Sequence, residues 1–167
     1  LTILTSFLLT ILASTSRLAG KVKVMAKKTL RAKCLEAAQK LARISAANDN
    51  GYCQCVSCDP RELHSWGHWK EMDGGHFIPK GSSSYHALDW EFNIHPQHKK
   101  CNMWGMRHGS AEAWYTIWMN KQFGTDFVEQ MLRDKKKIKK FYAADYREML
   151  ADFNEQIKFH KKRLGEL

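Results

Sequence analysis

Cys55-Val56-Ser57-Cys58 and His98-Lys99-Lys100-Cys101 are the two stretches that decide the fold of this chain. In each stretch two residues separate the outer pair, a spacing that lets one turn point both side chains at the same ion. Together the pairs supply the four nitrogen and sulfur ligands that tetrahedral zinc prefers. We therefore predict a structural zinc knot, which would contribute on the order of 10 kcal/mol to folding. Its ligands would be Cys55, Cys58, His98 and Cys101.

Two other interpretations of the cysteines stay open. Cys53 could replace Cys55 as a ligand, although a Cys-x-Cys pair makes a poorer metal knuckle than Cys-x-x-Cys. Alternatively, Cys55 and Cys58 form a redox or disulfide pair, and His98 and Cys101 are incidental. Four of the five cysteines lie near histidines in the sequence, which favours metal ligation in a reducing compartment.

The segment between the two pairs carries a histidine in a distinctive setting. Residues 72–81 read MDGGHFIPKG, Asn93 lies further on, and Asn102 directly follows Cys101. This order resembles the His-Asn-His (HNH) nuclease family, and more closely the phage recombination proteins of the NinG (Rap) type. Those proteins carry a basic helix, a Cys-x-x-Cys pair, an Asp-x-Gly-His-Phe segment, and an Asn-x-His followed by Cys-x-x-Cys-Asn. The resemblance covers residue 27 to the helix after Gly109, and His98 stands where those proteins usually have cysteine.

The resemblance implies an α+β fold with a ββα-metal (HNH) core and a structural zinc knot, flanked by N-terminal and C-terminal helices. Aromatic and β-branched residues between turn formers predict strands at 71–78 and 90–95, which would pair as a hairpin. A helix whose first turn includes Asn102 would follow. Apolar residues at helical spacing predict further helices at 27–47, at 111–123 with Ser110 as N-cap, at 125–132, and from about 138 onward.

By the same resemblance, His76 is the general base, because an imidazole with a pKa near 6.5 can accept a proton from water at working pH. Asn93 would brace the hairpin and the base. Asn102 would bind a catalytic divalent ion through its amide oxygen, and hard oxygen ligands favour Mg²⁺ or Mn²⁺. Asp73 is a candidate second ligand, although many HNH enzymes place the carboxylate immediately before the base, where this chain has Gly75. Lys80 and His95 are candidate phosphate or DNA contacts.

Several of these side chains also have a purely structural interpretation. His95 could bind phosphate or metal, or pack within the hairpin as an ordinary hydrogen-bonded side chain. The histidines with no assigned role are expected in exposed loops: His64, His68, His86 and His108. Four aromatic residues at helical spacings are expected to pack in the core rather than stack on bases: Trp104, Trp114, Trp118 and Phe123.

The chain is divided as follows. Residues 1–24 are interpreted as an extension outside the domain, either an over-extended translation start before Met25 or a signal-like segment. Residues 25–51 form a basic amphipathic helix, 52–109 the zinc-stabilised HNH core, and 110–167 a C-terminal helical region. The apolar stretch 1–12 is too short to span a bilayer, so no membrane association is expected.

Charge points to the partner. The formal net charge of +10, from 27 Lys and Arg against 17 Asp and Glu, attracts polyanions such as nucleic acids. Together with this charge, the resemblance implies a DNA endonuclease that hydrolyses phosphodiester bonds in branched recombination intermediates of a phage, in the cytoplasm of the bacterial host. A homodimer would suit two-fold symmetric junctions. The alternatives are a non-catalytic zinc-stabilised nucleic-acid-binding module and an exported, disulfide-bonded toxin nuclease.

Overall fold

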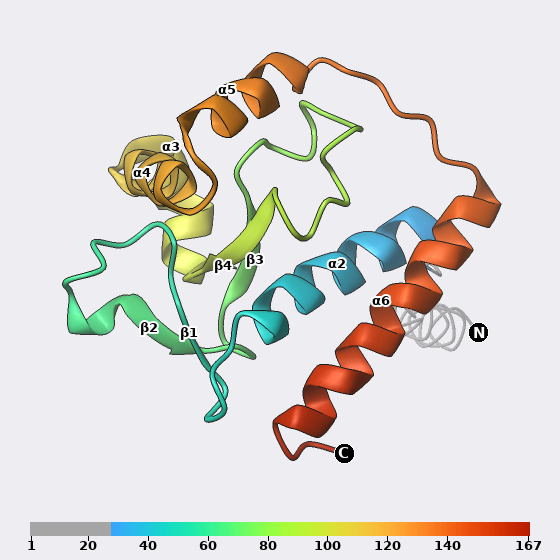
Figure 1. The fold of residues 1–167 in the computed structure, drawn as a ribbon, viewed down its shortest axis with the longest axis horizontal. Coiled ribbons are helices and arrows are strands. Elements are labelled where there is room, and N and C mark those ends of the chain that lie inside the picture. The colour runs from blue at the N-terminus through green and yellow to red at the C-terminus, as the bar shows by residue number, and fades with distance from the viewer. Residues whose placement is uncertain (1–27) are drawn as a thin grey trace, which may run out of the picture.

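The computed structural model describes residues 28–167, so the interpretation of residues 1–24 lies outside it. The first predicted helix begins at Leu30, after the Thr29 cap, and not at residues 25–27. The described chain is α+β, with helices arranged around two small antiparallel hairpins (Figure 1). None of the helices in residues 28–167 is long and apolar enough to cross a membrane.

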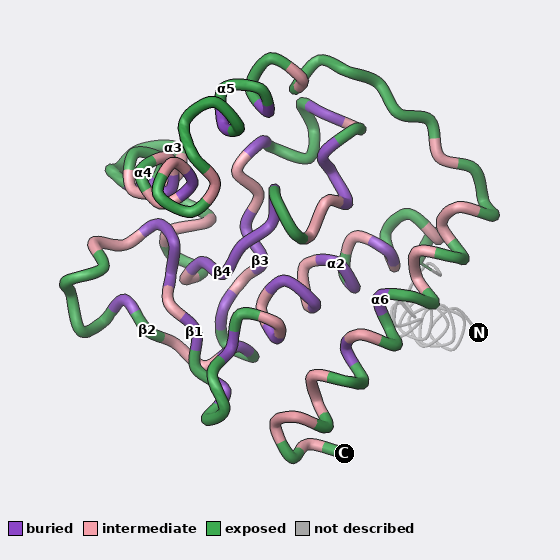
Figure 2. The backbone as a smooth tube through the Cα atoms, in the orientation of Figure 1, coloured by how far each residue is buried: buried purple, intermediate pink, exposed green. Residues whose placement is uncertain are grey.

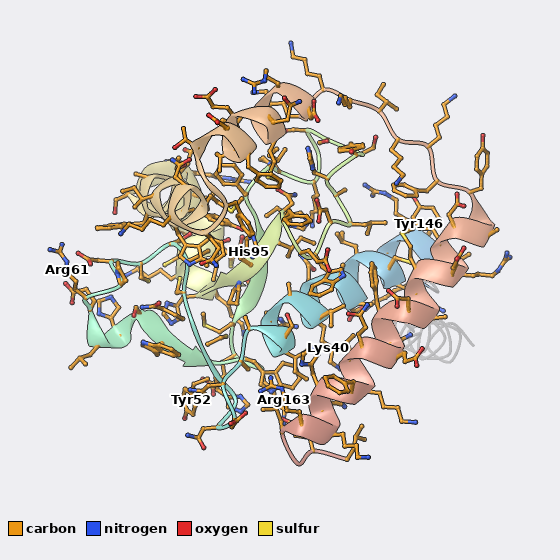
Figure 3. The ribbon with its side chains drawn as sticks, viewed as in Figure 1. Lys40, Tyr52, Arg61, His95, Tyr146 and Arg163 are labelled. Carbon is orange, nitrogen blue, oxygen red and sulfur yellow. The ribbon has the colours of Figure 1, made fainter. Side chains whose placement is uncertain are left out.

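Two long helices frame one side of the molecule: α2 (Leu30–Ser45) and α6 (Ala143–Arg163). The Thr29 side chain accepts a hydrogen bond from the Ala32 amide and caps α2. At the start of α2, the Cys34 thiol donates to the Tyr146 carbonyl at 2.9 Å. At its end, the Arg163 guanidinium donates to the carbonyls of Ile44 and Ala47 at 3.1 and 2.8 Å. The two helices therefore run side by side in the same direction (Figure 3).

The predicted hairpin is present, but its second strand begins later than predicted. Strand β3 (Asp73–His76) pairs with β4 (Ile94–Gln97) in the register Asp73↔Gln97 and His76↔Ile94. Residues 90–93 form a turn instead of a strand, because Asp89 accepts from the Phe92 amide through its side chain and from the Asn93 amide through its carbonyl. A second hairpin joins β1 (Tyr52–Gln54) to β2 (Trp66–His68).

One face of the β3–β4 hairpin packs against α2, and this contact forms the larger core (Figure 2). Alternation along β3 directs Gly74 and His76 to this face and Asp73 and Gly75 to the other. Gly74 is required for close packing, because a Cβ there would lie 2.5 Å from the Gln39 carbonyl oxygen. The larger core also receives Phe153 and Ile157 of α6.

The remaining helical elements lie after β4, apart from one 3-10 turn, Leu63–Ser65, which precedes β2. They are, in chain order, a π-helical turn (Cys101–Gly105), α3 (Met106–His108), α4 (Ala111–Phe123) and α5 (Thr125–Asp134). A smaller core joins α4 and α5 to the hairpins: Val56, Ile78, Tyr115, Met119, Val128 and Met131.

Two details of the helical prediction were wrong. Helix α4 has the predicted bounds, but the Ser110 side chain makes no capping hydrogen bond. The last helix begins at Ala143 rather than near residue 138, and residues 135–142 form no helix or strand. Like charges three or four residues apart destabilise a helix, and residues 135–140 read KKKIKK.

Candidate metal centre

Two separate segments bring the four predicted zinc ligands together. Cys55 directly follows β1, and Cys58 lies one turn later; His98 directly follows β4, and Cys101 begins the π-helical turn. The ligand atoms of these four residues all lie within 4.8 Å of one another. Cys58 Sγ lies 3.4 Å from His98 Nδ1 and 3.5 Å from Cys101 Sγ.

This donor set fits zinc. A tetrahedral ion with bonds of about 2.0–2.3 Å needs ligand atoms roughly 3.5–4 Å apart. Cys58 Sγ lies at about this spacing from the ligand atoms of His98 and Cys101, and all four ligand atoms lie within 4.8 Å of one another. Burial raises the pKa of the Cys55 and Cys58 thiols, so a bound cation would be needed to hold them as thiolates. Four protein ligands leave no open coordination position, and a zinc ion here would therefore be structural.

The alternatives for the cysteines are not supported in this geometry. All five cysteines of the chain are free, so Cys55 and Cys58 are not joined by a disulfide. Cys53 is fully buried away from the cluster, and its thiol faces the Gly67 carbonyl at 3.8 Å. Burial raises the pKa of Cys53 to about 12, which keeps it a protonated thiol and a poor ligand.

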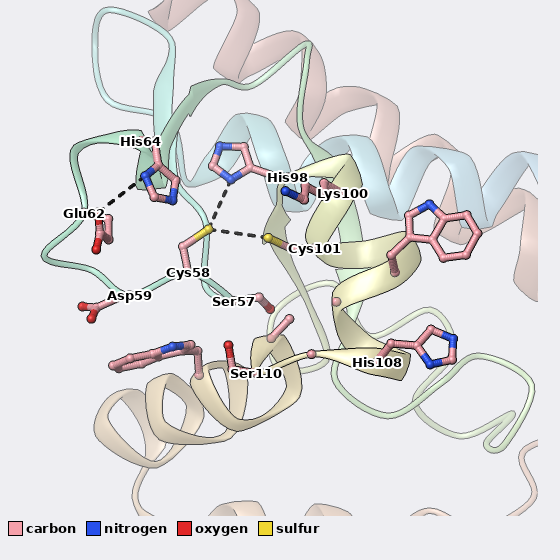
Figure 4. A pocket seen from close by; sticks show the side chains of 15 residues that line it. Ser57, Cys58, Asp59, Glu62, His64, His98, Lys100, Cys101, His108 and Ser110 are labelled. Carbon is pink, nitrogen blue, oxygen red and sulfur yellow. Dashed lines mark hydrogen bonds and ion pairs between the residues drawn. The ribbon is translucent and has the colours of Figure 1, made fainter.

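A cleft of about 680 Å³ opens beside the cluster (Figure 4). Cys58, His98 and Cys101 form one wall. The other sides include Glu62 and His64, whose side chains lie 3.6 Å apart, and the first turn of α4. Cys58 and Cys101 are half-buried, so the cluster is reachable from solvent through this cleft.

Asp73 and Asn102 meet on the face of the hairpin opposite α2. Asn102 lies in the π-helical turn that Cys101 begins, and its Nδ2 donates to Asp73 Oδ2 at 2.9 Å. Both side chains are half-buried. Because Asn102 directly follows Cys101, the position of Cys101 in the cluster also places Asn102 beside Asp73, the other predicted ligand of the catalytic ion.

Gln97 is a residue of this face that sequence reasoning missed. A Cβ on Gly75 would collide with Gln97 Oε1, so the Gln97 carboxamide occupies the space beside Gly75. Gln97 is fully buried, its Nε2 donates to Ser57 Oγ, and its Oε1 has no hydrogen-bond partner. A glutamine immediately before His98 gave no signal, because its importance depends on the cross-strand register.

His76 ends β3 and is half-buried. Its Nε2 lies 3.1 Å from the Ala87 carbonyl oxygen, which can only accept, so Nε2 carries the proton and Nδ1 keeps the lone pair of a neutral ring. Burial lowers the pKa of His76, the Ala87 hydrogen bond partly offsets this, and the nearby Lys80 charge lowers the pKa further. No hydrogen bond joins His76 to Asn102, and alternation places His76 and Asp73 on opposite faces of β3.

Asn93 ties together the ends of the loop between β3 and β4. It is fully buried, and its Oδ1 accepts from the Ile78 amide at 2.7 Å. Its Nδ2 donates to the carbonyls of Ile78 and His86, each at 3.0 Å. The three hydrogen bonds of its side-chain carboxamide therefore all lie within the loop that follows His76.

Comparison with models of known protein families assigns the chain to a family. A family model described as "Bacteriophage Lambda NinG protein" matches residues 12–163. The chain belongs to the NinG family. The match includes the Cys/His cluster and the β3–β4 hairpin, while no curated protein and no solved structure matches the chain.

The two candidate phosphate contacts of this NinG-family chain differ in accessibility. Lys80 is exposed on the loop after Pro79. His95 is only 7% exposed, with its ring 4.5 Å from Trp118 and 5.9 Å from Tyr115 between ring centroids (Figure 3). Burial lowers the pKa of His95 to about 4. Its contacts are those of a packed side chain.

Two expectations about aromatic and histidine side chains were wrong for this member of the NinG family. Trp104 is 65% exposed rather than packed in the core, because the π-helical turn directs it outward beside the cleft. His86 is only 4% exposed instead of lying on the surface. The Ser83 side chain accepts from the His86 amide, and Asp89 Oδ2 lies 3.7 Å from the His86 ring, so the loop folds over this histidine.

Proposed function

We propose that this NinG-family protein is a metal-dependent DNA endonuclease of the HNH type that hydrolyses phosphodiester bonds in branched or recombination-intermediate DNA of a phage, in the cytoplasm of the bacterial host. The observation that carries the proposal is the 2.9 Å contact between Asp73 and Asn102 beside the Cys/His cluster, on a hairpin that ends in His76. On a two-fold symmetric junction the protein would act as a homodimer.

We assign each residue a role that agrees with its contacts. His76 Nδ1 takes a proton from the attacking water, while the Ala87 carbonyl holds Nε2–H and thereby the ring orientation. Asn93 keeps the following loop in place through its three hydrogen bonds. Rotation of the Asn102 amide would bring Oδ1 to the point where Nδ2 now meets Asp73, and the two residues would then hold Mg²⁺ or Mn²⁺. When bound, that ion neutralises the scissile phosphate and stabilises the leaving oxygen.

The decisive experiment is cleavage of four-way-junction, linear duplex and single-stranded DNA with Mg²⁺ or with EDTA. His76→Ala should lower the rate about 10²–10⁴-fold, the usual contribution of a general base, while the melting temperature and DNA affinity stay unchanged. His64→Ala is the matched control, since His64 is an exposed histidine of the neighbouring cleft. Unchanged cleavage by His76→Ala would remove its assigned role.

The pH profile gives a second readout for the same base. Because the pKa of His76 is lowered, the neutral ring persists to lower pH, and the midpoint of the rise in kcat/KM with pH should lie below the ordinary value of about 6.5. Lys80→Gln removes a nearby positive charge and should shift that acidic limb to higher pH. A limb that does not respond to Lys80→Gln would assign the titration to another group.

The second candidate function is a zinc-stabilised DNA-binding module without catalysis. The observation that favours it is that β3 directs His76 and Asp73 to opposite faces of the hairpin. In that case the wild-type protein would bind DNA and cleave none of the three substrates with any divalent ion. Asp73→Asn would then leave every measured property unchanged.

A further inference from the structure

A lysine-rich segment lies apart from the two helices that it connects. Residues 135–142 link α5 to α6, and within them residues 135–140 carry five lysines and Ile138; we call residues 135–140 the lysine strap. In Figure 1 this orange segment runs along the outer side of the loop between β3 and β4. All six of its residues are exposed, and Ile138 is 82% exposed.

Specific contacts hold the strap on that loop. The Lys139 backbone amide donates to Ser84 Oγ at 2.9 Å. Lys137 Nζ lies 5.8 Å from the centre of the Tyr85 ring and forms an ion pair with Asp134 at 2.8 Å. The strap is thus fixed to the loop by its backbone and by Lys137, which leaves the other four lysine side chains for other partners.

Those four lysines, Lys135, Lys136, Lys139 and Lys140, form no ion pair with any carboxylate in residues 28–167. Lys139 Nζ lies 5.0 Å from the centre of the Phe141 ring. A cleft of about 470 Å³ beside the strap has Lys135 and Lys136 on one side and Phe77, Pro79 and Ser82 on another. Glu112 is its one acidic lining residue. Phe77 directly follows His76, so this positive surface borders the segment that carries the proposed base.

From this arrangement we infer that the lysine strap binds the DNA phosphate backbone and places it across the loop that follows His76. The inference rests on the proposed function and goes beyond it, because it assigns a DNA-binding surface to the strap. Unpaired lysines bind phosphates and release counterions, which gives salt-dependent affinity without sequence readout. Docking on Ser84 and Tyr85 keeps the lysines at one place, so the ordering cost at binding is low.

The first test compares two triple variants by fluorescence anisotropy on duplex DNA, in EDTA and at several salt concentrations. The strap variant is Lys135→Gln, Lys136→Gln and Lys140→Gln; the matched control, on the end of α6, is Lys158→Gln, Lys161→Gln and Lys162→Gln. The strap variant should lower the slope of log K against log salt by about 3 and weaken binding on the order of tenfold or more near 0.1 M salt. The control should retain the wild-type slope. An equal or larger loss in the control would overturn the inference.

A photocrosslink tests the position of the DNA directly. p-Benzoylphenylalanine in place of Ile138 should crosslink to duplex DNA, whereas the same group in place of Phe159, which is 66% exposed on α6, should not. The reverse pattern, or tighter capture of the wild-type protein by phosphatidylserine vesicles than by duplex DNA, would overturn the inference. Neither measurement needs cleavage. If the protein binds DNA through the strap but cleaves it with none of the divalent ions, the proposed nuclease activity is contradicted and this surface assignment stays intact.

Discussion

The two faces of the β3–β4 hairpin are built on different principles. The face toward α2 carries Gly74 and Ile94 and closes the larger apolar core. The opposite face carries Asp73, His95 and Gln97, and two buried atoms there, His95 Nε2 and Gln97 Oε1, have no hydrogen-bond partner. A buried polar atom without a partner costs about 1–3 kcal/mol. The α2 face is therefore built for apolar packing, and the polar face is where the sequence retains groups that stability alone does not explain.

Removing metal should have the largest effect, and it should separate the two faces. Chelation, or Cys58→Ser, removes a cross-link worth on the order of 10 kcal/mol. Amides of β3, β4 and residues 101–108 should lose hydrogen-exchange protection, while the α2–α6 pair keeps more of its own because these two helices pack directly on each other. Cys34→Ser is the control, since Cys34 lies outside the cluster and a serine can donate to the same Tyr146 carbonyl. Equal loss at α2 would show that the faces do not unfold separately.

Acid should destabilise the polar face through His95. The folded-state pKa of about 4 lies below the ordinary value of about 6.5, so the stability is fully present above pH 6.5 and is lost as pH falls toward 4. That shift corresponds to on the order of 3 kcal/mol. His95→Phe keeps the ring contacts without the titration, and its free energy of unfolding should fall less over this window in urea denaturation. If the free energy of unfolding falls equally in the wild type and in His95→Phe, a group other than His95 causes the acid sensitivity.

Substitution of the adjacent glycines Gly74 and Gly75 compares how tightly the two faces of the hairpin are packed. Gly74→Ala and Gly75→Ala should each cost about 1–3 kcal/mol by overpacking, measured as a loss in unfolding free energy. The Gly75 clash is with the Gln97 side chain, so Gln97→Ala should recover part of the loss. The Gly74 clash is with the backbone of Gln39, so Gln39→Ala should not rescue Gly74→Ala. Rescue of both, or of neither, would contradict this difference between the faces.

Trp104 should show the smallest effect on stability. Its side chain is 65% exposed, so Trp104→Ala should change the free energy of unfolding by only about 0.5 kcal/mol or less. Trp118→Ala is the comparison, because Trp118 packs on His95 of the polar face and should cost about 3 kcal/mol or more. A large loss for Trp104→Ala would mean that the π-helical turn belongs to the packed part of that face.

Local chemistry made part of the structure predictable. The four ligands of the cluster follow from residue type and spacing, because two turns of four residues preorganise each pair wherever the rest of the chain runs. The bounds of α4 follow from its apolar spacing and from Gly124, which takes a φ of 87° at its end. The hairpin was predictable as a pair, yet the start of β4 was not, because the Asp89 turn competes for residues 90–93.

By itself the sequence determined the zinc-type ligand set, the helix–hairpin–helix order and the NinG family, since these depend on neighbours within one turn or on an ordered set of short motifs. Only the tertiary structure decided that Asn102 meets Asp73, that Gln97 fills the space beside Gly75, and that the lysine strap lies on the loop after His76. Those contacts join residues from 22 to 55 positions apart. They depend on strand register and on which elements pack together, and no local spacing encodes either.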